Sequence, residues 1–165
     1  MERVRADLEA AGAAGRPILL DASARTAEEA ARALGVAPGQ IVKSLLFLVG
    51  GRPVLALVAG DRRCRPEALG PASGLHGPAV RADPETVRAV TGFAIGGVAP
   101  LGHPEPLPCV VDASLARFPV LWAAAGHPRA VFPTSFAELV RLAGGVVDAR
   151  IAEPSAGSGS VEGAR

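Results

Sequence analysis

The stretch Ile41-Val42-Lys43-Ser44-Leu45-Leu46-Phe47-Leu48-Val49 decides the fold, because it is almost wholly apolar and shows no helical spacing. Such a run predicts a buried strand. Gly50-Gly51-Arg52 follows it, and residues 53–59 form a second apolar run. Two such runs joined by a glycine-rich turn are typical of an antiparallel hairpin. A hairpin at this point argues against an all-parallel sheet.

Lys43 is the only lysine in the chain, and all other residues in the Lys and Arg count are arginine. Alternation along the strand places it on the same face as Ile41, Leu45 and Phe47. An amine on that face must reach solvent, bind an anion or lose its proton, because an unpaired buried charge is costly. Lys43 therefore indicates either a site that needs a compact ammonium group or a strand-edge lysine that reaches water.

Other elements are expected on both sides of the hairpin. Helices are predicted at residues 2–14, after a cap at Ser23 or Thr26, near 67–69, at 84–90 after Asp83, and after Thr134 or Ser135. Strands are predicted near residues 17–20, 107–111, 120–124, 130–132 and 146–149. The pattern favours one mixed α/β domain over residues 1–152, followed by a disordered tail over residues 153–165.

Composition limits the classes of function. The 165 residues suffice for one domain with a sizeable core, and a formal charge of +1 gives no global case for nucleic-acid binding. Cys64 and Cys109 lie far apart, so neither a disulfide framework nor a zinc site is expected. The chain shows no signal peptide and no membrane-spanning run, and we expect a cytoplasmic protein without membrane association.

The stretch from Thr91 to Pro104 is the second informative segment. It reads Thr91-Gly92-Phe93-Ala94-Ile95-Gly96-Gly97-Val98-Ala99-Pro100-Leu101-Gly102-His103-Pro104, with four glycines and two prolines. Glycine permits positive φ and close backbone approach, so the loop can aim its N–H groups at an anion or a carbonyl oxygen. The spacing fits neither a dinucleotide-binding nor a P-loop motif. A tight turn without function is the alternative interpretation.

Together with their neighbours, the Lys43 strand and this loop resemble the YbaK/EbsC family. These proteins are free-standing relatives of the editing domain inserted in bacterial prolyl-tRNA synthetases. The resemblance covers roughly residues 1–150 and is carried, in order, by residues 26–31, 41–45, 92–102, 111–112, 122–128, 131–132 and 139–140. It implies a mixed, largely antiparallel sheet or barrel-like core flanked by helices.

The resemblance also implies a function. The family hydrolyses the ester between a wrong amino acid and the 3′-terminal adenosine of tRNA. For this chain it implies a small amino acid on tRNA(Pro), with prolyl-tRNA synthetase as a further partner and no metal or cofactor. Hydrolysis of this labile ester can rest on positioning and on oxyanion stabilisation by backbone N–H groups.

The family's functional positions transfer to matching residues. The family lysine corresponds to Lys43, and the Gly-x-x-x-Pro loop to Gly96 through Pro100, with Gly96 and Gly97 in the catalytic role. The substrate-binding positions that we expect are Thr26, Ser44, Phe47, Ile95, Val98, Ala99, Pro100, His103, Asp112, Gly126 and His127.

Several of these residues have alternative interpretations. Ser44 points away from Lys43 and is better explained as a packing residue than as a nucleophile; the alanine-editing branch carries Asn there. His103 and His127 could line the pocket, act as a general base, or be ordinary loop histidines. Asp112 could hold the loop, contact ribose, or cap a helix at residues 113–115.

The basic residues and the pocket walls complete the expectations. Arg62, Arg63 and Arg65 could meet acceptor-stem phosphates or form a solvated loop. The strand face of Ile41, Leu45 and Phe47, set beside a glycine-rich wall, suggests a narrow apolar pocket that selects small substrates.

The competing function is a non-catalytic module that binds aminoacyl-tRNA or a synthetase and regulates it. A lysine Schiff-base enzyme is disfavoured, because no phosphate cup with an acid partner for a cofactor is evident.

Overall fold

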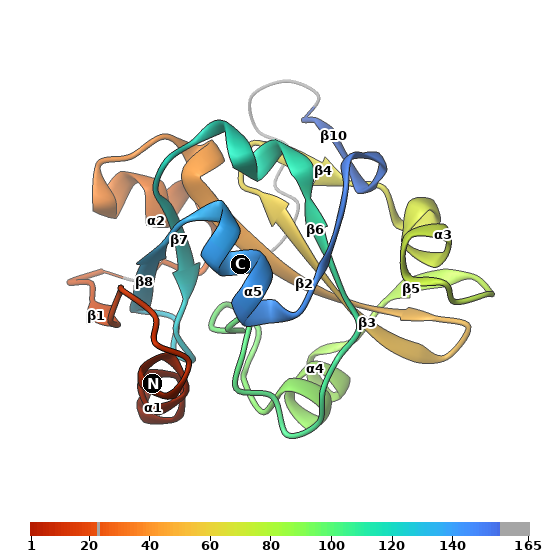
Figure 1. The fold of residues 1–165 in the computed structure, drawn as a ribbon, viewed down its shortest axis with the longest axis horizontal. Helices are drawn as coiled ribbons and strands as arrows, with labels where there is room; N and C mark the ends of the chain where they lie inside the picture. Colours follow the sequence, from red (N-terminus) through yellow and green to blue (C-terminus); the bar gives the residue numbers. More distant parts are fainter. Residues whose placement is uncertain (23, 156–165) are drawn as a thin grey trace.

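A computed structural model describes residues 1–22 and 24–155. Its central feature is the hairpin of β2 (Ile41–Val49) and β3 (Arg52–Ala59), which pair antiparallel from Val42 opposite Ala59 to Val49 opposite Arg52 (Figure 1). The hairpin prediction is therefore confirmed. Among the described residues, the pairing with β3 leaves the other edge of β2 for two different partners.

The remaining strands extend the hairpin into a mixed sheet of eight strands among the described residues, in the order β1-β8-β7-β2-β3-β6-β9. The flanking strands are β1 (Ile18–Leu19), β6 (Cys109–Asp112), β7 (Leu121–Ala124), β8 (Ala130–Thr134) and β9 (Val146–Asp148). A short strand, β5 (Ala79–Arg81), pairs with the end of β2. β2–β7, β3–β6 and β6–β9 are parallel, and the other pairs are antiparallel. The expected mixed α/β class is confirmed.

A second, two-stranded sheet joins β4 (Arg62–Cys64) to β10 (Ala152–Pro154). The sequence predicted neither strand, and the predicted tail began at residue 153. Glu153 and Pro154 instead pair with Arg63 and Arg62. The predicted domain boundary is thus too early by at least two residues, because a short strand needs only a partner, not a core-forming sequence. Residues 156–165 of the predicted tail lie outside the described residues.

Helices cover both faces of the large sheet. They are α1 (Glu2–Ala10), α2 (Ala27–Leu34), α3 (Leu69–Ser73), α4 (Pro84–Thr91) and α5 (Phe136–Ala143), with short 3₁₀ turns η1 (Pro38–Gln40), η2 (Pro66–Ala68), η3 (Ala113–Arg117) and η4 (Ala149–Ile151). The predicted caps Thr26, Asp83 and Ser135 each accept a hydrogen bond from the third following backbone N–H. Ser23, the alternative cap, lies outside the described residues. The first helix ends at Ala10, earlier than predicted.

The core is divided between the two faces. Helices α1, α4 and α5 pack on the face that carries Val42 and Leu46. On the opposite face, α2 packs around Ile41, and η2 and α3 pack around Leu45 and Phe47. Lys43 therefore lies at the seam between two separate apolar clusters. None of the helices in the described part of the chain has the length and apolar character needed to span a bilayer.

Candidate functional site

One edge of β2 is left without a strand partner at its centre. Pairing with β7 ends at Val42 opposite Ala123, and pairing with β5 begins at Phe47 opposite Arg81. Gly60 N donates to Ile41 O on the β3 side, and Ala82 N donates to Leu46 O on the other side. Because these directions alternate along a strand, the backbone N–H and C=O of Ser44 point into the gap. At Ser44 the backbone of β2 therefore has no strand partner on this side.

Ser44 is unusual at this gap for its side chain as well. It is 5% exposed, and within the described part of the chain its hydroxyl is the one buried side-chain polar atom with no hydrogen-bond partner. It borders a small cavity of about 10 Å³ that is also lined by Ile95 and Val98 of the glycine-rich loop. A cavity of that size holds about one water-sized group. Ser44 thus differs from a satisfied packing residue.

Lys43 lies on the opposite face of β2 and is only 3% exposed. Its Nζ donates a hydrogen bond of 2.6 Å to the backbone carbonyl of Arg62, the first residue of β4. The interpretation of a strand-edge lysine that reaches water is therefore wrong. The amino group is directed within the protein, toward the strand that β10 covers.

The glycine-rich loop carries a tight turn at its centre. Gly97 N donates to Ala94 O, and Gly96, the third residue of the turn, has φ +93°. A positive φ at that position is the mark of a type II turn and favours glycine. The N–H of Gly97 closes the turn, whereas in the described part of the chain the N–H groups of Gly96 and Val98 donate to no backbone carbonyl.

The turn packs closely against two other segments. A Cβ on Gly97 would lie 3.0 Å from three backbone atoms of His127, and one on Gly96 would lie 3.0 Å from the side chain of Arg25. Gly126 has φ +91° and packs against Phe93 in the same way. The structure thus brings the loop together with the β7–β8 turn and with the segment before α2.

His103 fixes the far end of the loop. Its Nε2 hydrogen-bonds Ala99 O at 2.8 Å, and its ring meets Phe93 edge-on. Burial lowers the pKa of His103 below its ordinary value; the bond to Ala99 opposes this, and nearby Arg3 adds to it. The neutral imidazole therefore stabilises the conformation of residues 99–103.

His127 is exposed and remains next to Gly97. Its Nδ1 accepts a hydrogen bond of 3.1 Å from the backbone N–H of Arg129. In the described part of the chain, its Nε2 makes no hydrogen bond. His127 is the histidine that the structure brings to the turn.

Two predicted binding residues lie elsewhere. Asp112 is 1% exposed, and its carboxylate accepts hydrogen bonds from Ala59 N and from the N–H and hydroxyl of Ser114. It acts as the cap of η3, which was the alternative interpretation. Phe47 is buried in the cluster under α3, with which no loop residue packs. The apolar wall that the sequence suggested beside the loop is therefore not present.

The cysteines and the basic cluster are also placed. Cys64 and Cys109 are buried and form no disulfide, and burial raises the pKa of the Cys109 thiol to about 12. Arg63 and Arg65 form ion pairs with Glu153, at 3.9 and 3.8 Å, and Arg65 also pairs with Glu67 at 3.1 Å. Acidic neighbours therefore offset much of this cluster's charge. No group of residues suited to hold a metal ion occurs in the described chain.

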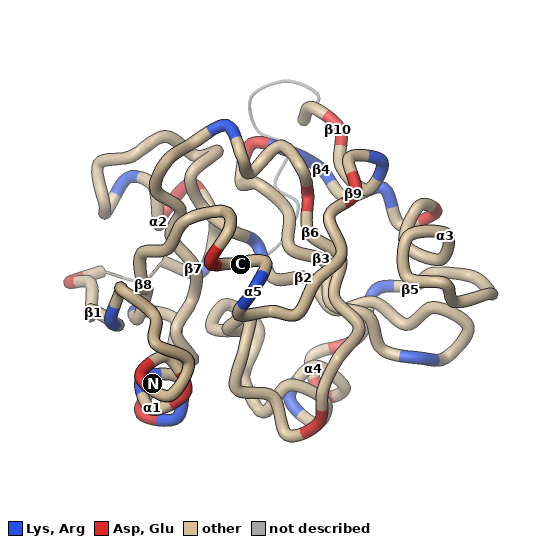
Figure 2. Tube along the Cα trace, in the orientation of Figure 1, with Lys and Arg blue, Asp and Glu red and all other residues tan. Residues whose placement is uncertain are grey.

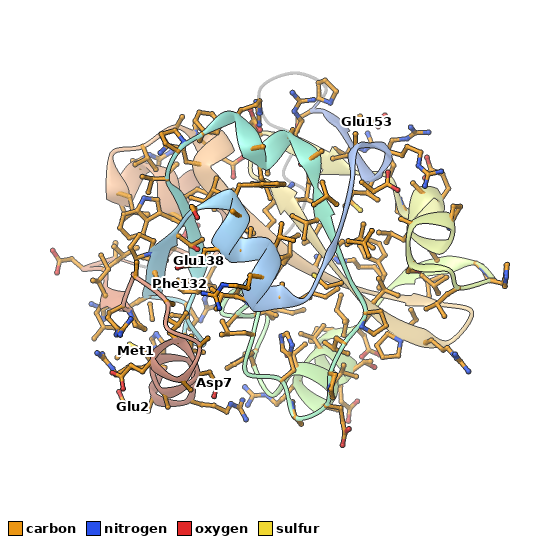
Figure 3. All side chains as sticks on the ribbon, in the orientation of Figure 1. Met1, Glu2, Asp7, Phe132, Glu138 and Glu153 are labelled. Carbon is orange, nitrogen blue, oxygen red and sulfur yellow. The ribbon has the colours of Figure 1, made fainter. Side chains whose placement is uncertain are left out.

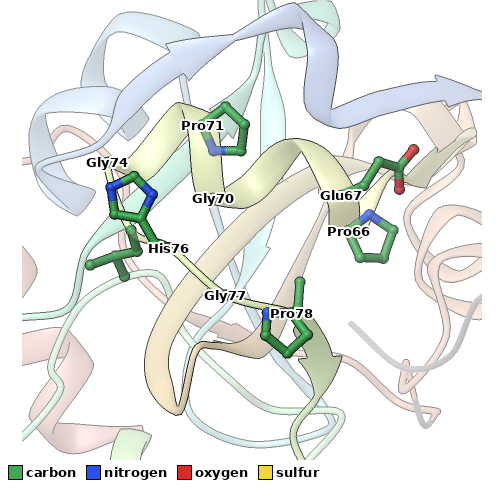
Figure 4. Close-up of a pocket in the computed structure, with 10 residues that line it drawn as sticks. Pro66, Glu67, Gly70, Pro71, Gly74, His76, Gly77 and Pro78 are labelled. Atoms are coloured by element: carbon green, nitrogen blue, oxygen red, sulfur yellow. The ribbon is translucent and has the colours of Figure 1, made fainter.

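A larger pocket of about 750 Å³ lies apart from this gap (Figure 4). The segment from Pro66 to Ala79, which includes η2 and α3, curls around it, with Glu67 and His76 on its wall. None of the residues predicted to form the site lines it. The pocket is therefore separate from the candidate site.

Sequence reasoning missed Arg25, whose stem covers Gly96. It stands just before the Thr26 cap, and no local pattern marks it. Its position depends on long-range backbone bonds, from Ala24 N to Pro128 O and from Leu20 N to Arg129 O. Such contacts have no signature in sequence spacing.

Comparisons with known proteins identify the family and agree with the fold. The model of the aminoacyl-tRNA editing domain matches residues 21–142. A solved structure described as a candidate trans-editing enzyme for prolyl tRNA synthetase is 44% identical, with a TM-score of 0.82, and the match covers 94% of this chain and 96% of that one.

Two further relatives match this chain over a smaller share of its length. The uncharacterized protein YwhH of Bacillus subtilis is 35% identical over 64% of this chain and 67% of its own. A proline--tRNA ligase of Nitratidesulfovibrio vulgaris is 42% identical over 48% of this chain, and the match spans 14% of the ligase. The family match and the near-complete structural match make this chain a member of the aminoacyl-tRNA editing domain family, as its resemblance to the YbaK/EbsC proteins predicted.

Proposed function

We propose that the protein is a deacylase that hydrolyses the ester of a mischarged small amino acid on tRNA, with tRNA(Pro) as the tRNA. One observation carries the proposal: Ser44, at the part of the β2 edge that has no strand partner, lines one small cavity together with Ile95 and Val98 of the glycine-rich loop. Membership of the editing family and the likeness to a candidate trans-editing enzyme for prolyl tRNA synthetase support it.

The chemistry needs little from side chains. The substrate is a labile ester, so a held water and a donor for the developing oxyanion suffice. The N–H groups of Gly96 and Val98 are the proposed donors, since that of Gly97 closes the turn. Water activation is assigned either to loop carbonyl groups or to the substrate's own ribose hydroxyl.

Lys43 and the small cavity have separate roles in the proposal. Lys43 holds the Arg62 carbonyl and so fixes β2 against β4, from which its amino group can turn to a ribose or phosphate oxygen of the terminal nucleotide. The 10 Å³ cavity at Ser44 accepts about one water-sized group of the aminoacyl side chain. A cavity of that size favours alanine, serine or cysteine over larger residues.

A panel of mischarged tRNAs tests the proposal. Purified protein is mixed with tRNA(Pro) charged with alanine, serine, cysteine or proline, and release of the amino acid is followed over time. Release from at least one mischarged tRNA supports the proposal. Tight binding of these tRNAs without any release would instead support the regulatory module, for which prolyl-tRNA synthetase is then the partner to test.

A further inference from the structure

The arginines of this chain fall into two groups according to their partners. Seven form ion pairs with carboxylates among the described residues: Arg5, Arg16, Arg63, Arg65, Arg117, Arg141 and Arg150. Figure 2 shows acidic and basic residues interspersed over many elements. The other eight arginines of the described chain have no such pair, and three of these, Arg3, Arg25 and Arg129, are exposed and lie on segments that border the glycine-rich loop. These three therefore present positive charge that nothing in the described chain neutralises by direct contact.

The three arginines come from different segments, and two of them contact the loop directly. Arg25 lies with its aliphatic stem against Gly96. Arg3, on α1, stacks over the Phe93 ring at 4.9 Å, with its guanidinium against Gly92. Arg129 follows His127, whose backbone touches Gly97. Cations from three separate segments therefore lie at the loop or next to a residue that contacts it.

Local contacts hold these guanidinium groups in place. Arg129 Nε donates a hydrogen bond of 2.9 Å to Leu20 O, which leaves its terminal N–H groups outward. Arg3 is held by its ring contact with Phe93. Asp7, labelled on α1 in Figure 3, lies beside Gly102, and in the described chain it forms no ion pair with any of the three arginines. An arginine held in this way loses less freedom when it binds a phosphate.

We infer that Arg3, Arg25 and Arg129 form a phosphate-binding rim, which receives the backbone of the acceptor end of tRNA. The inference rests on the proposed function, because it places the RNA strand relative to the same gap. Lys43 is 3% exposed and donates to Arg62 O, so its proposed contact is limited to the terminal nucleotide and its charge does not reach the RNA strand before that nucleotide. A phosphodiester chain that ends in the gap needs cations around the gap, and these arginines supply them.

The inference departs from the sequence-based expectation for Arg62, Arg63 and Arg65. Arg63 and Arg65 face Glu67 and Glu153, and these carboxylates would repel a phosphate chain. If RNA binds through the rim, substitution of the rim arginines weakens RNA binding and substitution of Arg63 does not. If RNA binds through the cluster, the reverse holds. The two docking modes are therefore separable by experiment.

The test measures binding and hydrolysis separately. Arg3→Gln, Arg25→Gln and Arg129→Gln keep much of each aliphatic stem and remove the charge. Arg52→Gln is the matched control, because Arg52 is exposed, has no ion pair in the described chain, and lies at the β2–β3 hairpin. Affinity for an uncharged acceptor-stem RNA hairpin is measured by fluorescence anisotropy over a range of salt, with circular dichroism as the check on folding.

Each rim variant should weaken RNA binding by about five- to tenfold at roughly 0.1 M salt and lower the salt slope by about 0.7–0.9. Arg52→Gln and Arg63→Gln should leave both values unchanged. Unchanged binding in all three rim variants, or a loss confined to Arg63→Gln, would overturn the inference.

A minimal ester distinguishes this failure from failure of the proposed function. Aminoacyl-adenosine carries no phosphate chain, so the rim variants should hydrolyse it at the wild-type rate. Hydrolysis of charged tRNA by every rim variant at the wild-type rate would overturn only the rim. Absence of hydrolysis of both substrates by the wild-type protein would overturn the deacylase, while the RNA-binding measurement still decides the rim.

Discussion

At the residue scale, Lys43 combines burial with a specific acceptor. Its amino group reaches the Arg62 carbonyl through an otherwise apolar seam. A thin stem fits this seam, whereas a planar guanidinium needs more space and a different arrangement of acceptors. This geometry explains why an arginine-rich chain retains lysine here.

Substitution of Lys43 should therefore abolish most activity. We expect Lys43→Met and Lys43→Arg to lower the single-turnover deacylation rate by about 100-fold or more, as removal of one positioned donor typically does. Lys43→Met should also cost roughly 1–3 kcal/mol of unfolding free energy, because the Arg62 carbonyl loses its donor. Near-wild-type turnover by folded Lys43→Met would remove Lys43 from the mechanism.

Ser44 offers a complementary measurement. Its buried hydroxyl has no partner, so Ser44→Ala removes an unsatisfied group. The free energy of unfolding should stay the same or rise by up to about 1 kcal/mol. Urea denaturation of the two proteins measures this difference, and a clear loss of stability would show that the hydroxyl is satisfied in the folded state.

His103 should make stability depend on pH. Its folded-state pKa is lowered, so the unfolded chain binds the proton more readily and stability falls as pH drops through the ordinary value of 6.5. In His103→Gln the amide can still donate to Ala99 O, but no proton is bound. Thermal unfolding between about pH 7.5 and pH 5 should show a smaller loss for the variant. Equal losses in the two proteins would contradict the role of burial.

At the scale of elements, the glycine-rich loop works through its backbone. Gly96 needs its positive φ for the turn, and Gly97 has no space for a Cβ against the His127 backbone. The loop's position relative to the β2 edge therefore depends on both residues.

Alanine at either position should impair hydrolysis. Gly97→Ala must move the His127 turn by a few tenths of an ångström or more, and we expect a rate loss of about tenfold or greater in each variant. Gly51→Ala is the matched control, since Gly51 has φ +83° with no atom near its added Cβ. It should lose about 1 kcal/mol of stability while its rate stays unchanged. Wild-type rates in Gly96→Ala and Gly97→Ala would make the loop an ordinary turn.

Elements with strong local signals were predictable. The hairpin turn, the caps Thr26 and Asp83, and the glycine-rich loop each follow from residues close in sequence. The parallel pairings of β2 with β7 and β3 with β6 were not predictable, because a strand's own pattern does not name its partner. β4, β5 and β10 are too short to show alternation, and their pairing is set by long-range contacts.

The candidate site divides in the same way. The resemblance assigned Lys43 and the Gly96–Pro100 loop to one site, which stays a prediction; the loop packs on the Val42 and Leu46 face of β2, and Lys43 lies on the other face. Asp112 and Phe47 are residue types that suit a binding site. In the structure, the Asp112 side chain caps η3, and the Phe47 side chain packs in a core cluster. Arg25 escaped notice, since only the folded chain brings it to Gly96.

At the scale of the whole molecule, the sheet separates the functions of its two faces. Helices α1 and α4 support the loop on one face, while α2 and α3 flank the Lys43 seam on the other. The gap in the β2 edge lies between β7 and β5, where no strand pairs with this edge of β2. The fold thus leaves one place at which strand backbone, loop backbone and a surface cation meet.

Under the proposed function, the small cavity at Ser44 predicts which aminoacyl esters the protein prefers. A missing or extra methylene is worth about 1–3 kcal/mol in an apolar pocket, so alanine, serine and cysteine should differ modestly from one another. The proline ring should be excluded by a clash with the loop, whose exit is fixed by Pro100.

The most direct test is the single-turnover deacylation rate of the wild-type protein on tRNA(Pro) charged with alanine, serine, cysteine or proline. We predict rapid hydrolysis of at least one of the three small-amino-acid esters, and a rate for Pro-tRNA(Pro) at least about 100-fold lower. Rapid hydrolysis of Pro-tRNA(Pro), or no hydrolysis of any of the four, would contradict the account.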